Sequence, residues 1–247
     1  MIRLVIDKMN IAIIFAGGTG ERMSTKTKPK QFLELHGKPI LVYTLEQFQN
    51  HKEIDAIILV SLESWINYCE ELVDKYRLTK VEKIVPGGST GQESIFNGLE
   101  VANSNFSEES IVLIHDGVRP LIDEETITNN IKSVRKYGSA ITVTPAIETI
   151  TIKNFEGEIG KIVDRSKCQM ARAPQSFWLR DIYQVHKSAR EKEHLEFIDS
   201  ASMMQHYGYK LHPVVGTMEN IKITTSGDFY IFRAIIDARE NSQIFGI

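Results

Sequence analysis

The sequence predicts an α/β fold with a doubly wound, mostly parallel sheet, and three observations predict it. Short apolar runs rich in β-branched residues recur at regular spacing, which is typical of buried parallel strands. Segments with apolar residues at helical spacing lie between these runs. No internal repeat, low-complexity tract or linker interrupts the alternation. We therefore expect a Rossmann-like sheet in a single domain formed by residues 1–247.

The elements are expected in a regular order along the chain. The expected strands cover residues 11–15, 56–60, 81–85, 111–114 and 140–143. The expected helices between them cover residues 40–48, 64–76, 93–102 and 124–137. Pro39 suits the first turn of the first helix. Further helices are expected at residues 179–191, 199–207 and 228–241, and a further strand at residues 210–215. Residues 1–8 are interpreted as a loose extension, because Met9 could equally be the start.

The alternation of strands and helices stops after Pro145. Residues 147–152 and 159–163 each alternate polar and apolar side chains, and the turn-forming sequence Asn154-Phe155-Glu156-Gly157 lies between them. This pattern predicts a β-hairpin, here called the arm (residues 147–170), inserted into the α/β pattern. An isolated two-stranded hairpin is only marginally stable in water. We therefore expect the arm to dock on another surface, and a second subunit is a natural candidate.

Composition and charge exclude several classes of partner. The net charge is −3, from 29 basic and 32 acidic residues, so there is no electrostatic case for a nucleic-acid polymer. No run reaches about 18 apolar residues, so no membrane span is expected, and the N-terminus lacks the pattern of a signal peptide. The two cysteines, Cys69 and Cys168, are far apart and form no ligand pattern, which favours a reduced, cytoplasmic setting.

A glycine-rich turn, Gly17-Gly18-Thr19-Gly20, follows the first expected strand. Without a Cβ in the way, its backbone N–H groups can approach an anion closely. Arg22 and Lys30 follow, and two cations suit several phosphates held at once. The sequence does not match the dinucleotide-binding fingerprint, because Met23 occupies the position of its third glycine. It does not match the P-loop pattern either. The glycines alone fit equally well an ordinary turn on a parallel sheet.

The full spacing is more specific than the glycines. Ala-Gly-Gly-x-Gly-x-Arg-Met from Ala16, followed by Pro29-Lys30-Gln31, resembles the nucleotidyltransferases that make nucleotide-activated sugars and polyols. Within them it is similar to the cytidylyltransferases acting on methylerythritol phosphate and ribitol phosphate. The resemblance implies that the loop from Ala16 to Gly20 wraps the triphosphate of CTP. It also implies that Arg22 and Lys30 stabilise the reacting phosphorus.

A second glycine pair, Gly87-Gly88, follows the third expected strand. Ligands of open α/β sheets bind at the carboxyl ends of the strands, so this pair should face the same crevice as Gly17. A plain strand-to-helix turn is the alternative. The resemblance assigns Gly88, Ser89 and Ser94 to the cytosine and ribose side of CTP, and we include Gly87 in the predicted nucleotide site.

The fourth expected strand ends in His115-Asp116-Gly117-Val118-Arg119-Pro120, which resembles the His-Asp-x-x-Arg-Pro of the family. Mg²⁺ typically takes one or two carboxylates together with phosphate oxygens, so Asp116 is the predicted metal ligand, with Gly117 beside the nucleotide. Arg119 is expected to fix the loop or to reach the acceptor. A helix-capping aspartate with a surface arginine is the alternative. His115 should point to the other face and be structural.

The residues expected to bind the acceptor are spread along the second half of the chain. The resemblance implies an exchange of arms between twofold-related subunits, so that Thr149 and Arg165 grip the acceptor phosphate in the opposite subunit. Asp199 can accept a hydrogen bond from a polyol hydroxyl, and Lys222, in Asn220-Ile221-Lys222-Ile223-Thr224, should contact phosphate. The chain departs from the family at two positions where threonine is usual, which are Ala173 and Ile198.

The predicted reaction is attack by an acceptor phosphate oxygen on the α-phosphorus of CTP, with pyrophosphate leaving. Arg22, Lys30, Lys222 and Mg²⁺ would neutralise charge. Residues 61–76, 117–120 and 174–177 look more like the ribitol-phosphate branch of the family, so the resemblance favours D-ribitol 5-phosphate as acceptor. The alternatives 2-C-methyl-D-erythritol 4-phosphate and a related pentitol or sugar phosphate stay open. A nicotinamide-dependent oxidoreductase is disfavoured, because Val60-Ser61 stands where an acidic residue is needed. A non-catalytic nucleotide-binding protein would be expected to have lost Lys30 or Asp116.

Overall fold

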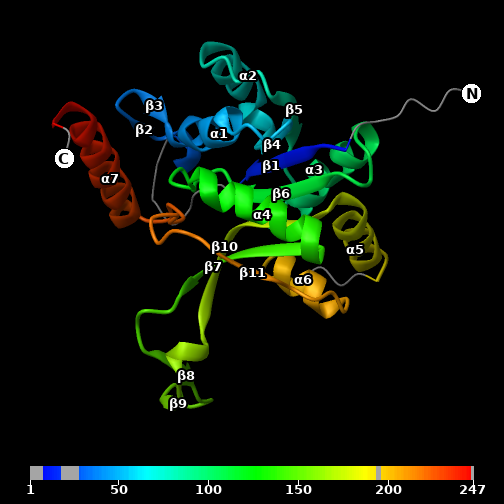
Figure 1. Cartoon of the computed structure of the whole chain (residues 1–247), viewed down its shortest axis with the longest axis vertical. Helices are drawn as coiled ribbons and strands as arrows, with labels where there is room; N and C mark the ends of the chain where they lie inside the picture. Colours follow the sequence, from blue (N-terminus) through cyan, green and yellow to red (C-terminus); the bar gives the residue numbers. More distant parts are fainter. Residues whose placement is uncertain (1–7, 18–27, 193–195, 246–247) are drawn as a thin grey trace, which may run out of the picture.

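The computed structural model describes residues 8–17, 28–192 and 196–245. Its centre is a seven-stranded sheet with the order β11-β7-β10-β6-β1-β4-β5 (Figure 1). The strands of this sheet are β1 (Asn10–Ala16), β4 (Ala56–Ser61), β5 (Val81–Pro86), β6 (Ile111–Asp116), β7 (Ser139–Pro145), β10 (Gln169–Trp178) and β11 (Pro213–Val215). Every neighbouring pair is parallel except the two that involve β10. The predicted mostly parallel, doubly wound sheet is therefore confirmed.

Helices cover both faces of the sheet. They are α1 (Ile40–Asn50), α2 (Ile66–Lys75), α3 (Gly91–Asn105), α4 (Glu124–Tyr137), α5 (Leu179–Glu191), α6 (Ser200–His206) and α7 (Ser226–Phe245). Short 3₁₀ turns lie at η2 (Lys30–Phe32), η3 (Glu63–Trp65) and η4 (Arg165–Lys167). In the described part of the chain, no helix combines the length and the apolar character that crossing a membrane requires.

The alternation of side chains along β1 explains the two-sided packing. Ala12 and Ile14 pack in a core with residues of α1, α2 and α4, whereas Ile11 and Ile13 pack in a second core with residues of α3, α5 and α6. All four side chains are fully buried. A strand covered on both faces has to be apolar throughout, which is why the sequence pattern of β1 is so clear.

The helix ends follow local sequence signals. Thr90 Oγ1 accepts a hydrogen bond from the backbone N–H of Glu93 at the start of α3, and the carboxylate of Asp123 accepts one from Thr126 at the start of α4. Gly138 ends α4 with a φ of 86°, a left-handed conformation that glycine adopts without strain. Pro39 is the residue before α1 and does not lie in its first turn, which differs from the expectation.

The strand β10 is absent from the expected strands and is the main difference between sequence and structure. It lies antiparallel between β6 and β7 in the middle of the sheet. β10 contains Pro174, and proline lacks the backbone N–H that a residue in a central strand normally donates to its neighbour. The pairing with β7 is interrupted between Ala171 and Gln175, so that N–H is not needed there.

The arm contains two short strands that pair only with each other. β8 (Ile150–Lys153) and β9 (Ile159–Val163) are antiparallel, and Figure 1 shows them projecting away from the other elements. Apolar side chains on the arm are exposed, and Phe155 at the turn is fully so. The dimerisation role of the arm stays a prediction, as does the single-domain organisation.

Some expected boundaries were wrong. The strand expected over residues 210–215 forms only at Pro213–Val215, and the strand expected from residue 147 begins at Ile150. A small hairpin of β2 (Glu34–Leu35) and β3 (Lys38–Pro39) was not expected. The backbone N–H of Met9 donates to Ser110 Oγ at 3.1 Å, and most of the predicted extension, residues 1–7, lies outside the described residues.

Candidate active site

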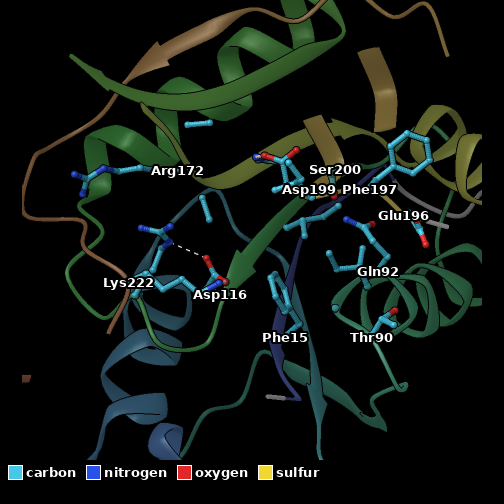
Figure 2. A pocket seen from close by; sticks show the side chains of 18 residues that line it. Phe15, Thr90, Gln92, Asp116, Arg172, Glu196, Phe197, Asp199, Ser200 and Lys222 are labelled. Carbon is cyan, nitrogen blue, oxygen red and sulfur yellow. Dashed lines mark hydrogen bonds and ion pairs between the residues drawn. The ribbon is translucent and has the colours of Figure 1, made fainter. Parts of the chain in front are cut away.

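A cavity of about 480 Å³ lies at the carboxyl ends of β1 and β6. The start of α3, the middle of β10, residues 196–200 and Lys222 complete its wall (Figure 2). This is the edge of the sheet at which open α/β folds bind ligands. The cavity therefore lies at the edge of the sheet where the sequence motifs were expected to form a ligand-binding crevice.

The two glycine turns meet beside Ser94. A Cβ placed on Gly17 would lie 3.1 Å from Ser94 Oγ, and one on Gly87 would lie 3.0 Å from the same atom. Ser94 Oγ donates to the carbonyl oxygen of Thr90 at 2.9 Å and accepts from the backbone N–H of Gly88 at 3.0 Å. A Cβ at either position would press on Ser94 Oγ, which two hydrogen bonds hold in place, so glycine fits both turns without displacing it. Four residues of the predicted triphosphate site lie outside the described residues: Gly18, Thr19, Gly20 and Arg22.

Ser89 is held by its own turn. Its backbone N–H and its Oγ both donate to Glu93 Oε2, at 2.8 and 2.7 Å. Hydrogen bonds from the side chain and backbone of Ser89 lower the pKa of Glu93. A Cβ on Gly88 would meet Glu93 Cγ at 2.1 Å, so glycine is required beside this contact. The assignment of Ser89 to the nucleotide stays a prediction.

Gln31, the last residue of the Pro-Lys-Gln motif, ties Lys30 to the first glycine turn. Gln31 Nε2 donates to the carbonyl oxygen of Ala16 at 2.6 Å, and the side chain is buried. Lys30 therefore lies beside the end of β1, close to where the glycine turn begins. The sequence interpretation gave Gln31 no role, although it is part of the motif.

Asp116 is the centre of a charged cluster at one end of the cavity. Its Oδ1 lies 2.6 Å from Lys222 Nζ, and its Oδ2 accepts a hydrogen bond from Arg119 Nε at 2.7 Å (Figure 2). Burial raises the pKa of Asp116, but Arg119 and Lys222 together outweigh burial and hold the pKa well below its usual range. The carboxylate is therefore ionised at neutral pH. Arg119 also donates to the carbonyl oxygen of Asn220, so it fixes both loops.

Arg172 adds a third cation that the sequence interpretation missed. It lies on the unexpected strand β10 and lines the cavity. Arg172 Nη1 donates to the carbonyl oxygens of Met218 and Asn220, at 3.1 and 2.7 Å, and Nε donates to Thr144 Oγ1. Burial and the nearby Arg119 lower the pKa of Arg172. Three cations against one carboxylate make this end of the cavity suited to phosphate.

Gly117 and His115 have structural roles on either side of Asp116. A Cβ on Gly117 would lie 2.9 Å from Ala16 Cβ, so glycine lets β1 and β6 end close together. The ring of His115 packs against Phe48 and is fully buried. Burial lowers the pKa of His115 to about 4, so the ring is neutral. His115 is not among the residues that line the cavity.

Asp199 lines the cavity and also begins α6. Its Oδ1 accepts from the backbone N–H of Ser202 at 2.8 Å, and its Oδ2 accepts from Gln175 Nε2 at 2.7 Å. Gln175 in turn accepts from the backbone N–H of Ala201. The carboxylate is thus fixed in place with lone pairs left over for a ligand. Ile198, beside it, is almost fully exposed.

Thr149 and Arg165 lie on the arm and not in the cavity of the same chain. Both are exposed, and Arg165 Nη1 donates to the carbonyl oxygen of Ile147 at 2.7 Å. The structure therefore brings Asp116, Arg119, Asp199 and Lys222 to one cavity and leaves Thr149 and Arg165 outside it.

Comparison with known proteins gives the family. A family model described as 2-C-methyl-D-erythritol 4-phosphate cytidylyltransferase (IspD) matches residues 10–238. The chain belongs to the IspD family of cytidylyltransferases. The resemblance inferred from the motifs is confirmed, and the chain is a CTP-dependent nucleotidyltransferase as predicted.

Relatives within the IspD family carry two different names. The chain is 54% identical to a ribitol-5-phosphate cytidylyltransferase of Vibrio parahaemolyticus, over 96% of this chain and 100% of the relative. It is 43% identical to a 2-C-methyl-D-erythritol 4-phosphate cytidylyltransferase of Clostridium acetobutylicum, over 92% of this chain and 97% of the relative. A crystal structure of the 4-diphosphocytidyl-2C-methyl-D-erythritol synthase from Anaerococcus prevotii is similar with a TM-score of 0.80. Its sequence identity is 29%, with 93% of this chain and 99% of that one covered.

Proposed function

We propose that the protein transfers CMP from CTP to the phosphate of D-ribitol 5-phosphate, giving CDP-ribitol and pyrophosphate. The observation that carries the choice of acceptor is the high identity to relatives named for ribitol 5-phosphate, over nearly the whole chain. The second candidate acceptor is 2-C-methyl-D-erythritol 4-phosphate, which a more distant relative and the family model favour. The two acceptors share a phosphate and differ in the carbon chain.

The proposed reaction exchanges one phosphoanhydride bond for another. An oxygen of the acceptor phosphate attacks the α-phosphorus of CTP, and the bond from that phosphorus to the bridging oxygen breaks, so that its electron pair leaves with pyrophosphate. A phosphate monoester is mostly a dianion at neutral pH, since its second pKa is about 6. No general base is therefore required, and catalysis rests on positioning and on neutralisation of charge.

The residues of the charged cluster suit this task. The side chain of Lys222 is more exposed than that of its ion-pair partner Asp116, so its ammonium group can turn towards a phosphate oxygen. Arg119 and Arg172 hold the carbonyl oxygen of Asn220, two residues before Lys222, and so keep the lysine at the cavity. Lys30 and Arg22 would supply further positive charge to the triphosphate.

The donor atoms at this site fit a magnesium ion held mainly by the substrate. Asp116 is an ionised carboxylate on the cavity wall, and each of its oxygens keeps a lone pair beyond its contact with Arg119 or Lys222. Mg²⁺ commonly binds one carboxylate together with phosphate oxygens and water. Asp116 would hold the ion, which would supply charge neutralisation on the triphosphate.

We further propose that two subunits exchange arms and that the enzyme works in the cytoplasm. The exposed apolar side chains of the arm support the exchange, because a lone hairpin gains little from leaving them in water. Exchange would bring Thr149 and Arg165 to the acceptor phosphate of the other subunit. The free cysteines Cys69 and Cys168 support a reducing compartment.

The experiment that tests the function measures pyrophosphate release from CTP with a panel of purified acceptors. The panel contains D-ribitol 5-phosphate, other pentitol 5-phosphates and 2-C-methyl-D-erythritol 4-phosphate. We expect the highest kcat/KM with D-ribitol 5-phosphate, and a strong preference for CTP over ATP and GTP. Lys30→Ala should lower turnover with every acceptor on the order of 10²–10³-fold. A higher kcat/KM with 2-C-methyl-D-erythritol 4-phosphate would overturn the choice of acceptor.

A further inference from the structure

The turn that carries Lys30 is a short one. η2 covers Lys30–Phe32, and the backbone N–H of Phe32 donates to the carbonyl oxygen of Pro29 at 2.9 Å. The backbone N–H of Leu33 donates to the carbonyl oxygen of Lys30 at 3.2 Å. Hydrogen bonds in 3₁₀ turns have poorer geometry than those in α-helices. Contacts from outside the turn are therefore needed to fix the backbone from which the lysine side chain extends.

Phe32, the last residue of η2, is fully buried among aromatic rings. Its ring stacks on that of Trp65, with the centroids 4.6 Å apart and the planes 18° apart, and makes a T-shaped contact with Tyr68 at 5.3 Å. The rings of Trp65 and Tyr68 also make a T-shaped contact, at 5.5 Å. Aromatic pairs in these arrangements are more favourable than their buried area alone implies. The aromatic cluster of Phe32, Trp65 and Tyr68 therefore fixes one end of the turn.

Polar contacts fix the same turn from other directions. Gln31 Nε2 donates to the carbonyl oxygen of Ala16 at the end of β1. Lys28 Nζ donates to Glu34 Oε1 at 2.8 Å, and it also lies over the ring of Tyr68, 5.3 Å from the centroid. The turn is thus held on both sides of its lysine.

Trp65 and Tyr68 belong to residues 61–76, one of the segments whose resemblance favours a ribitol phosphate acceptor. No residue of this segment is among the described residues that line the cavity. The segment begins at Ser61, the last residue of β4, whose carbonyl oxygen accepts from the backbone N–H of Gly87 at 2.7 Å. It therefore starts beside the second glycine turn, and its contact with the site runs through Phe32.

We propose that Trp65 is a positioning residue for the reaction: it holds Phe32, and through η2 it holds Lys30 where the lysine meets the triphosphate in the transition state. The inference rests on the proposed function, which assigns Lys30 to the triphosphate. A misplacement of about 1 Å can cost about 10²-fold in rate, so a turn without its aromatic support would lower turnover. A contact that matters only in the transition state affects kcat and leaves KM nearly unchanged.

The test is a double-mutant cycle of Trp65→Ala and Lys30→Ala, with pyrophosphate release from CTP as the readout. Trp65→Ala alone should lower kcat about 10- to 100-fold, while the KM values for CTP and for the acceptor stay within about threefold. In the Lys30→Ala background the same substitution should change kcat less than about threefold, because no lysine is left to position. General damage to the fold would lower kcat by the same factor in both backgrounds.

Two further variants separate positioning from packing. Trp65→Phe keeps a ring to stack on Phe32 and should restore most of the turnover. Trp178→Ala is the matched control, because it removes the same side chain from a position packed against the same core. Trp178 pairs with Ile111 at the start of β6, at the edge of the sheet opposite the cavity, so this variant should keep near-normal turnover. Thermal melting checks folding, and Trp65→Leu replaces Trp65→Ala if the alanine variant melts below the assay temperature.

The dependence on Lys30 decides the question. Equal losses of kcat from Trp65→Ala in the wild-type and Lys30→Ala backgrounds would overturn the inference while leaving the proposed function intact. Near-normal turnover of Trp65→Ala would overturn it as well. Near-normal turnover of Lys30→Ala would instead overturn the role that the proposed function gives to the lysine, which keeps the two failures distinct.

Discussion

Replacing Arg119 by alanine tests whether the charged cluster around Asp116 stabilises the fold, in addition to its proposed role in binding substrate. The side chain is 12% exposed and donates to Asp116 at 2.7 Å and to the carbonyl oxygen of Asn220 at 3.0 Å. A hydrogen bond involving a charged group contributes about 1.5–3 kcal/mol. Lys222 and Arg172 still contact the same two acceptors after the substitution, so the lower half of the summed range applies. We therefore expect Arg119→Ala to lower the free energy of unfolding by about 3–4.5 kcal/mol.

Urea unfolding at pH 7 and fixed protein concentration measures this loss. Arg135→Ala is the matched control, because it removes the same charge from an exposed pair. Arg135 is 51% exposed and lies 3.2 Å from Glu53. Exposed ion pairs contribute about 0–1 kcal/mol, so the control should change little. A loss for Arg119→Ala no greater than that of the control would refute the reasoning and leave Arg119 a role in ligand binding alone.

Three further predictions concern the metal, the pH dependence and the subunit arrangement. Asp116→Asn should weaken the response of turnover to Mg²⁺, since an amide is a poorer ligand than a carboxylate; an unchanged magnesium titration would show that the ion is held elsewhere. Burial, and to a lesser extent Arg190, lowers the pKa of His186 from 6.5 to about 4, so between these pH values the unfolded chain takes up a proton that the folded chain does not. His186 should therefore contribute a fall of about 3 kcal/mol in the free energy of unfolding as pH drops through this range, and His186→Phe should remove that part of the slope in urea titrations; an identical slope in the variant would contradict it. Mixing Arg165→Ala with Lys30→Ala subunits should partly restore activity, because a heterodimer with exchanged arms has one intact site. No recovery after subunit exchange confirmed by mass spectrometry would mean that each chain builds its own site.

The elements that could be predicted from sequence are those with a local signal, either a run of apolar residues or residues that typically begin and end helices. β1 is apolar along its whole length because both faces are covered, and Asp123 and Gly138 mark the ends of α4. β10 lacks such a pattern, since Pro174 interrupts it and its place in the sheet depends on β6 and β7, which lie far away in the sequence.

The same distinction applies to the site. Asp116, Arg119 and Lys222 belong to short motifs with a recognisable spacing, and the structure brings them together. Arg172 was missed because its strand was missed. Arg22 belongs to a motif but lies outside the described residues.

The place of β10 in the sheet has a consequence for the order in which the chain can fold during synthesis. β7 has no partner among the strands made before it, because its neighbours in the finished sheet are β10 and β11. The parallel strands β1, β4, β5 and β6 can pair as soon as they leave the ribosome, whereas β7 must wait for the chain to continue through the arm to Trp178. At about 5–20 residues per second this wait lasts roughly two to seven seconds. During that interval β7 and one edge of β6 are both unpaired, so chaperones or a neighbouring nascent chain could reach them.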